Sequence, residues 1–241
     1  MIELKDVSFT YESGETQNNL NHINVTIQDG ETILLCGESG CGKTTLLSLL
    51  GGLDSPTRGK IFFEGQDISQ TGLAAHRRNH VSFVFQAYNL IDYLTSVENV
   101  SLTSKLPPLP ILERLGLTKE ESKRNVLKLS GGQQQRVAIA RALASEAPII
   151  LADEPTGNLD EDTAQGIIEI LKESAHQMNK CVVVVTHSHE LAEQADVVFR
   201  LKKGELQTLE RVQGPSAPQQ PRKRNIRSNE GKLSSMDGNA G

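Results

Sequence analysis

Tryptophan is absent from the 241 residues, and aromatic residues make up only 4% of the sequence. Proteins that hold single-stranded nucleic acid stack its bases on aromatic side chains, so this scarcity argues against that class of binding. The sequence also lacks any apolar run near the roughly 18–20 residues that span a bilayer. Its first residues lack the charged and apolar regions of a secretory signal peptide. We therefore expect a cytosolic protein that reaches a membrane only through a partner.

Cysteine is scarce, and net positive charge is found only in the last stretch of the chain. Cys36, Cys41 and Cys181 form no CxxC pair and no metal-ligand pattern, which is typical of a reducing compartment. Residues 212–241 carry five basic and two acidic residues, a net charge of +3, so the total of −5 leaves −8 on residues 1–211. An acidic body argues against nucleic acid as a partner. The tail is rich in Pro, Gln, Ser, Gly and Asn, a composition that predicts disorder.

Short apolar segments alternate with helical segments along the rest of the chain. The expected strands are residues 2–10, 23–27, 32–36, 60–63, 81–85, 149–152 and 181–185, and the expected helices include 43–50 and 162–176. Near-continuous apolar strands that alternate with helices indicate an α/β fold with a parallel sheet buried on both faces. Residues 87–144 are mostly helical in pattern, although prolines interrupt them, and we expect a helical subdomain inserted into the core.

A glycine-rich loop follows the apolar strand ILLC and precedes the helical run TTLLSLL. Its sequence GESGCGKT matches the pattern G-x-x-x-x-G-K-[ST], in which bare backbone N–H groups at a helix start surround phosphates. Lys43 would neutralise the β- and γ-phosphate oxygens of a nucleotide, and the Thr44 hydroxyl would ligate Mg²⁺. The predicted ATP-binding residues of this loop are Gly37, Glu38, Ser39, Gly40, Cys41, Gly42, Lys43, Thr44 and Thr45.

Two carboxylates, Asp153 and Glu154, end the apolar strand at 149–152. A lone acidic pair at a strand end is commonly a solvated turn. Ligands of open parallel sheets, however, sit at the carboxyl ends of the strands, and the phosphate loop is predicted at the same edge. We therefore expect Asp153 to help to hold Mg²⁺ and Glu154 to orient and deprotonate the attacking water.

A second candidate anion site lies at Ser130, Gly131, Gly132 and Gln133, just before the helical run QQQRVAIARALA. Ser130 is a good N-cap, and the two glycines leave the first N–H groups of the helix open. The residues alone do not distinguish an anion site from an ordinary capped helix.

The segment LSGGQQQRVAIARA resembles the signature motif of the ATP-binding-cassette (ABC) family, and the family's other motifs occur in order over residues 1–209. Tyr11 is similar in place to the aromatic residue that stacks on adenine. Gln86 resembles the glutamine that touches Mg²⁺ and water, residues 156–160 resemble the D-loop that ends at Asp160, and His187 resembles the switch histidine at the γ-phosphate. The resemblance implies the P-loop NTPase fold within residues 1–211: a mixed, mainly parallel sheet core, an N-terminal antiparallel β subdomain and the inserted helical subdomain.

The resemblance also implies partners. Cassettes of this family work as a head-to-tail homodimer with ATP sandwiched between subunits, so Ser130 to Gln133 would close on ATP held by the other subunit. FQAYNLIDYLTSVENV and ILADEPTGNLD look most like the subgroup of macrolide exporters, lipoprotein-release complexes and antimicrobial-peptide exporters. That subgroup implies an ATPase at the cytoplasmic face of the plasma membrane, with a four-helix permease that has a large extracytoplasmic domain. A short, proline-rich stretch at 101–117 departs from the subgroup, and a regulatory output, such as control of a cell-wall hydrolase, is the alternative.

Overall fold

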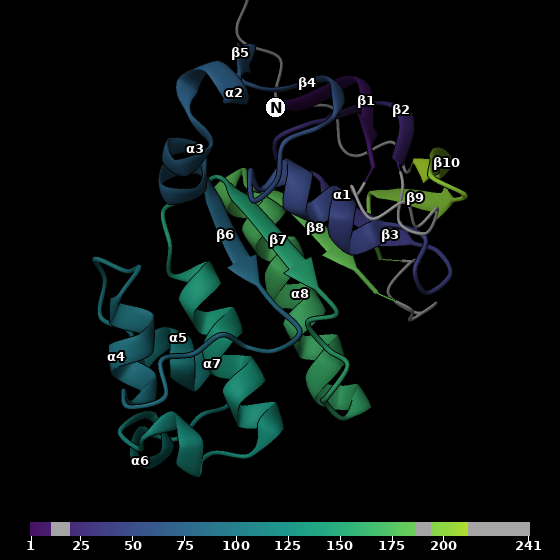
Figure 1. Ribbon diagram of the computed structural model, residues 1–241. Coiled ribbons are helices and arrows are strands. Elements are labelled where there is room, and N and C mark those ends of the chain that lie inside the picture. The colour runs from purple at the N-terminus through teal and green to yellow at the C-terminus, as the bar shows by residue number, and fades with distance from the viewer. Residues whose placement is uncertain (11–19, 187–193, 212–241) are drawn as a thin grey trace, which may run out of the picture.

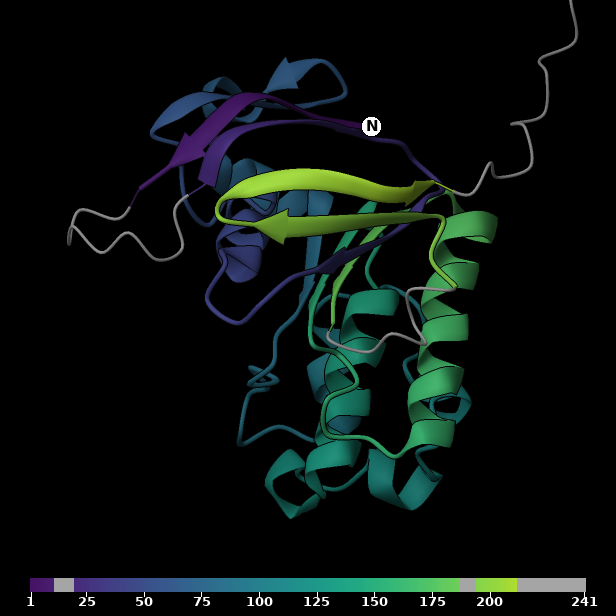
Figure 2. The same ribbon diagram turned by 90° about the vertical axis from the view of Figure 1, so that its right-hand side faces the viewer.

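Two β-sheets and the helices around them make up the computed structural model, which describes residues 1–10, 20–186 and 194–211 (Figures 1 and 2). None of the helices in these residues is long and apolar enough to cross a membrane.

The smaller sheet is antiparallel and has the strand order β2-β1-β4-β5. Its strands are β1 (Ile2–Phe9), β2 (Leu20–Ile27), β4 (Arg58–Phe63) and β5 (Gln66–Asp67). Buried and more exposed residues alternate along much of β1, as they do in a strand with one face on the core. This sheet confirms the antiparallel β subdomain that the resemblance implied.

The larger sheet has the order β10-β9-β3-β8-β7-β6. Its strands are β3 (Thr32–Cys36), β6 (Val81–Val84), β7 (Ile149–Asp153), β8 (Cys181–Val185), β9 (Val197–Lys202) and β10 (Glu205–Arg211). All neighbouring strands run parallel except β10, which pairs antiparallel with β9. The carboxyl ends of β3, β6, β7 and β8 therefore share one edge, as the sequence predicted.

Helices flank both sheets. They are α1 (Lys43–Leu50), α2 (Ile68–Thr71), α3 (Leu73–His80), α4 (Ser96–Ser101), α5 (Leu109–Arg114), α6 (Lys119–Ser122), α7 (Gly131–Leu143) and α8 (Glu161–Met178), with a 3-10 turn at Val126–Lys128. Helices α4 to α7 lie between β6 and β7 in the chain, and in both views they gather at the end of the molecule opposite the antiparallel sheet (Figures 1 and 2). The proline-rich stretch 101–117 contains the short helix α5, which belongs to this group.

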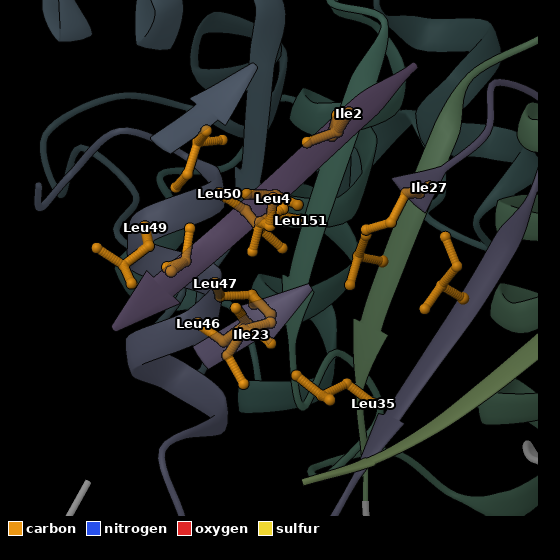
Figure 3. Packing of buried hydrophobic residues seen from close by; sticks show 14 of the residues in the cluster. Ile2, Leu4, Ile23, Ile27, Leu35, Leu46, Leu47, Leu49, Leu50 and Leu151 are labelled. Atoms are coloured by element: carbon orange, nitrogen blue, oxygen red, sulfur yellow. The ribbon is translucent and has the colours of Figure 1, made fainter. Parts of the chain in front are cut away.

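The parallel sheet separates two hydrophobic clusters, because alternate residues of its strands point to opposite faces. Ile33 and Leu35 of β3 join the cluster that contains α1 and the antiparallel sheet (Figure 3). Leu34, between them, joins the cluster that contains α7 and α8. Because both faces of the parallel sheet are buried, packing holds in place the strands at whose ends the candidate site lies.

Candidate functional site

The phosphate loop leaves β3 at Cys36 and enters α1 at Lys43. Gly40 and Gly42 have φ values of 74° and 104°, in the left-handed region that side chains disfavour. Gly37 has a different requirement, since a Cβ there would lie 2.4 Å from the backbone oxygen of Leu201. The glycines of the pattern are therefore required by backbone conformation and by close packing.

Lys43 is buried, and its ammonium group folds back over the loop. Its Nζ donates hydrogen bonds to the backbone oxygens of Gly37 and Glu38, both at 2.9 Å. These bonds hold the positive charge beside the first N–H groups of α1, where the helix dipole also favours an anion.

A hydroxyl and a carboxylate meet at the carboxyl edge of the sheet. Thr44 Oγ1 donates to Asp153 Oδ2 at 2.9 Å, across 109 residues of sequence. Hydroxyl and carboxylate oxygens are ligands that Mg²⁺ prefers. The donor set therefore fits the magnesium ion that the sequence predicted, with the amide of Gln86 in the same cavity lining.

Glu154 follows Asp153 in a strained backbone conformation with φ at 48°. Its N–H donates to the backbone oxygen of Val185 at 2.9 Å, which ties it to the end of β8. Gln86 Nε2 donates to Glu154 Oε2 at 3.3 Å. The two side chains predicted to handle water are thus brought together from the ends of β6 and β7.

These groups line one cavity of about 440 Å³. Its lining comprises Ser39, Gly40, Gly42, Lys43, Thr44, Thr45, Gln86, Asp153, Glu154 and Val185. The cavity combines a cation, open helix N–H groups and a carboxylate pair, which is the set of groups needed to bind a phosphate chain and to activate water on it.

The second candidate anion site lies apart from this cavity, since residues 130–133 are not in its lining. Ser130 caps α7 in a capping box with Gln133: Gln133 N donates to Ser130 Oγ at 3.3 Å, and Ser130 N donates to Gln133 Oε1 at 2.9 Å. Gln133 Nε2 also donates to Glu121 Oε1 at 2.6 Å. Within the described residues, one copy of the chain does not bring the two candidate anion sites into one cavity.

Asp160 is the N-cap of α8 and accepts from Thr163 N at 3.0 Å and from Thr163 Oγ1 at 2.8 Å. These hydrogen bonds lower the pKa of Asp160 below its ordinary value, so the group stays ionised near neutral pH. Tyr11 and His187, the other two predicted nucleotide contacts, lie outside the described residues.

The structure adds Tyr88 and Arg141, to which the sequence assigned no role, and it gives a contact to Asn158, which was predicted only as part of the D-loop segment 156–160. They join the turn after Gln86 to α7 and to the segment after Glu154. All three lie in segments that the sequence singled out as motifs, but the sequence did not predict their contacts, because these join positions 52 to 70 residues apart.

Comparisons with known proteins agree on one family. Residues 20–157, more than half of the chain, match the family described as ABC transporter. An uncharacterized ABC transporter ATP-binding protein of Bacillus subtilis is 40% identical over 222 residues, which are 88% of this chain and 98% of the relative. The macrolide export ATP-binding/permease protein MacB 2 of Aeromonas hydrophila is 42% identical over 221 residues, but the match spans 86% of this chain and only 34% of that protein.

Solved structures give the same result. The dimeric structure of MJ0796, a bacterial ABC transporter cassette by its description, has a TM-score of 0.81 and 39% identity, covering 89% of this chain and all of that one. A second structure of MJ0796, bound to ADP and Pi in a post-hydrolysis state, has a TM-score of 0.80 and 38% identity over the same shares of the two chains. The curated relative of that name is from Methanocaldococcus jannaschii. The chain belongs to the ABC transporter family and is an ATP-binding cassette with the α/β fold and the ATPase activity of that family.

Proposed function

We propose that residues 37–45 cradle the phosphates of ATP and that Glu154 is the general base of its hydrolysis. In this assignment Lys43 exchanges its bonds with the loop carbonyls for bonds with phosphate oxygens. Glu154 takes a proton from a water that Gln86 helps to orient, and the proposed switch residue His187 contacts the γ-phosphate. The single observation that carries the assignment is the 2.9 Å hydrogen bond between Thr44 and Asp153, which joins the phosphate loop to the acidic strand end.

Magnesium belongs to the same proposal. Thr44, Asp153 and Gln86 would hold Mg²⁺, which when bound neutralises charge on the phosphate oxygens. Asp153 and Glu154 then have separate roles, because Asp153 contacts Thr44 while Glu154 contacts Gln86.

A homodimer would complete the site. Ser130, Gly131, Gly132 and Gln133 lie outside the cavity lining of their own chain, so they would close on ATP held by the loop of a second copy, with Asp160 near the junction. Tyr11 would stack on the adenine. The similarity to a cassette described as dimeric supports this arrangement.

The output we propose is export or extraction of a hydrophobic compound, peptide or lipoprotein through a separate permease. The relatives named macrolide exporters support this subgroup. The permease would have four membrane helices and a large extracytoplasmic domain. Residues 1–211 would form the ATPase domain at the cytoplasmic face of the membrane, with residues 87–144 as its inserted helical subdomain and 212–241 as a basic tail.

Glu154→Gln tests the catalytic assignment. The variant keeps the phosphate cradle and removes the base, so we expect ATP binding to persist while kcat falls at least about 100-fold. Glu205→Gln, at the exposed start of β10, is the matched control and should leave kcat unchanged. Turnover of Glu154→Gln near the wild-type rate would exclude Glu154 as the base.

The same variant tests the partner. Purified from detergent-solubilised membranes with Mg-ATP, Glu154→Gln should co-purify with a four-helix membrane protein that has a large extracytoplasmic domain. Recovery of only a soluble homodimer would contradict the permease assignment. If the membrane partner has an extracytoplasmic part that activates a cell-wall hydrolase, the function is the regulatory alternative and not export.

A further inference from the structure

The turn that follows Gln86 has an unusual backbone. Tyr88 and Asn89 have φ values of 61° and 48°. Asparagine tolerates the left-handed region, but a bulky residue such as tyrosine rarely adopts it. A strained residue beside a reactive centre persists only when its surroundings over-determine it, and such residues cluster at functional sites.

Arg141 of α7 holds this turn in place. Its Nη1 donates to the backbone oxygen of Asn89 at 2.7 Å, and its Nη2 donates to that of Tyr88 at 3.1 Å. Tyr88 N also donates to the oxygen of Phe85 at 3.1 Å. The two bonds from one guanidinium fix both carbonyls of the strained pair, which sets the direction of the Tyr88 side chain.

The Tyr88 hydroxyl lies where three segments meet. Asn158 Nδ2, in the segment after Glu154, donates to Tyr88 Oη at 3.0 Å. A Cβ on Gly131, at the start of α7, would lie 3.1 Å from the same Oη, and a Cβ on Gly132 would lie 3.2 Å from Leu159 Cδ2. The hydroxyl therefore touches the segment 154–158 and lies against the first residue of α7.

Two side-chain bonds connect the same pair of segments. Gln86 bonds Glu154 at 3.3 Å, and two residues further along Tyr88 bonds Asn158 at 3.0 Å. The first bond is long for an amide and a carboxylate. A long bond of this kind is sensitive to how the two segments are held together. Beyond the pairing of β6 with β7, the hydrogen bond between Asn158 and the Tyr88 hydroxyl also holds them together.

We infer that Tyr88 is a positioning residue whose hydroxyl, through Asn158, holds Gln86 against Glu154 and makes that spacing sensitive to the position of the α7 start. The inference rests on the proposed roles of Gln86 and Glu154. It adds a residue outside the cavity lining that sets how the groups proposed to contact nucleotide and water are arranged.

Tyr88→Phe in the full-length protein is the test. The ring, the turn and both Arg141 bonds remain, and only the hydroxyl is lost. Loss of one neutral hydrogen bond corresponds to about a fivefold change. We expect kcat to fall about fivefold while KM for ATP and the melting temperature stay at wild-type values. Tyr93→Phe, at an exposed tyrosine of the same region, should leave kcat unchanged.

The partner variant Asn158→Ala completes a double-mutant cycle. If the hydroxyl acts through Asn158, Tyr88→Phe has no further effect on kcat in the Asn158→Ala background. Wild-type kcat in Tyr88→Phe, effects of the two variants that multiply, or a fall in kcat matched by a lower melting temperature would each overturn the inference. The variant Glu154→Gln shows which of the two ideas has failed. If Glu154 is the base, this variant loses turnover whether or not Tyr88 is a positioning residue.

Discussion

Replacement of Gly37 with alanine perturbs the phosphate loop at one defined contact. The new Cβ would lie 2.4 Å from the backbone oxygen of Leu201 and 2.7 Å from Cys41 Sγ. The Cys41 side chain can rotate away, but the Leu201 carbonyl belongs to β9, which pairs with β3 on one side and β10 on the other. The loop therefore has to move instead of the strand.

The size of that movement follows from the contact. Ordinary van der Waals contact of a Cβ begins near 3.4 Å, so Gly37 has to shift by about 1 Å away from Leu201. Gly37 also supplies one of the two carbonyls that hold Lys43 Nζ, and the shift displaces this carbonyl together with the N–H cradle. A misplacement of about 1 Å in a positioned site costs on the order of 100-fold in rate.

Steady-state ATPase kinetics of Gly37→Ala therefore should give kcat/KM about 100-fold below wild type. Gly166→Ala is the matched control, because a Cβ at Gly166 in the middle of α8 meets no atom within 4 Å. That control should keep full activity and gain about 1 kcal/mol of unfolding free energy from helix propensity. If kcat/KM of Gly37→Ala stays within about threefold of the wild-type value, the loop adapts to the new methyl group and the role given to the Leu201 contact is wrong.

Three further predictions address other parts of the molecule. Lys43→Ala should weaken ATP binding at least about 100-fold in calorimetry, because the ammonium that we propose to bind the phosphate oxygens, and that the loop carbonyls of Gly37 and Glu38 hold in place, is lost. Ser130→Arg, made in the Glu154→Gln background, should abolish the dimer that ATP induces while each monomer still binds nucleotide, and a dimer that persists in light scattering would contradict the cross-subunit site. Burial lowers the pKa of His76 below 6.5, so the folded state takes up fewer protons than the unfolded chain, and its unfolding free energy should fall as the pH drops below about 6.5. Urea titrations at several pH values between about 5 and 7 give the unfolding free energy at each pH, and this free energy should vary less with pH in His76→Gln than in the wild type.

The sequence predicted the elements that carry strong periodicity or a motif. The strand Thr32–Cys36 and the helix Lys43–Leu50 have the predicted bounds, because a fully apolar strand, a glycine loop and an apolar helix leave few alternatives. The hairpin of β9 and β10 was not among the predicted strands. Its turn is formed by Lys203 and Gly204, both at positive φ, and a glycine between two alternating segments was the available signal.

Helices α2 and α3 were also missed. They are four and eight residues long, and α3 is polar in sequence although it buries His76. Its imidazole Nε2 lies 3.1 Å from the backbone oxygen of Leu50 at the end of α1. A contact of this kind depends on tertiary packing, which local propensity does not contain.

For the site, the sequence predicted the groups that line the cavity but not the supports around them. Lys43, Thr44, Asp153 and Glu154 follow from motifs whose chemistry requires those residue types at those positions. The strained conformation of Tyr88 does not follow from a motif. Its left-handed backbone is held by contacts with Arg141 and Asn158 that only the folded chain supplies.

The two hydrophobic clusters explain how one sheet can connect both predicted anion sites. Helix α1, which starts at the phosphate loop, packs in the cluster on one face of the parallel sheet, and α7, which starts at Ser130, packs in the cluster on the other. The proposed catalytic groups Gln86 and Glu154 stand at the ends of strands that both clusters share. A shift of α7 relative to the sheet would leave the phosphate loop in place but would act on the turn that Arg141 and the Tyr88 hydroxyl hold. The Gln86 amide and the proposed base Glu154 would therefore respond to the position of α7 before the phosphate loop does, so a second subunit that pushes on α7 would act first on these two groups.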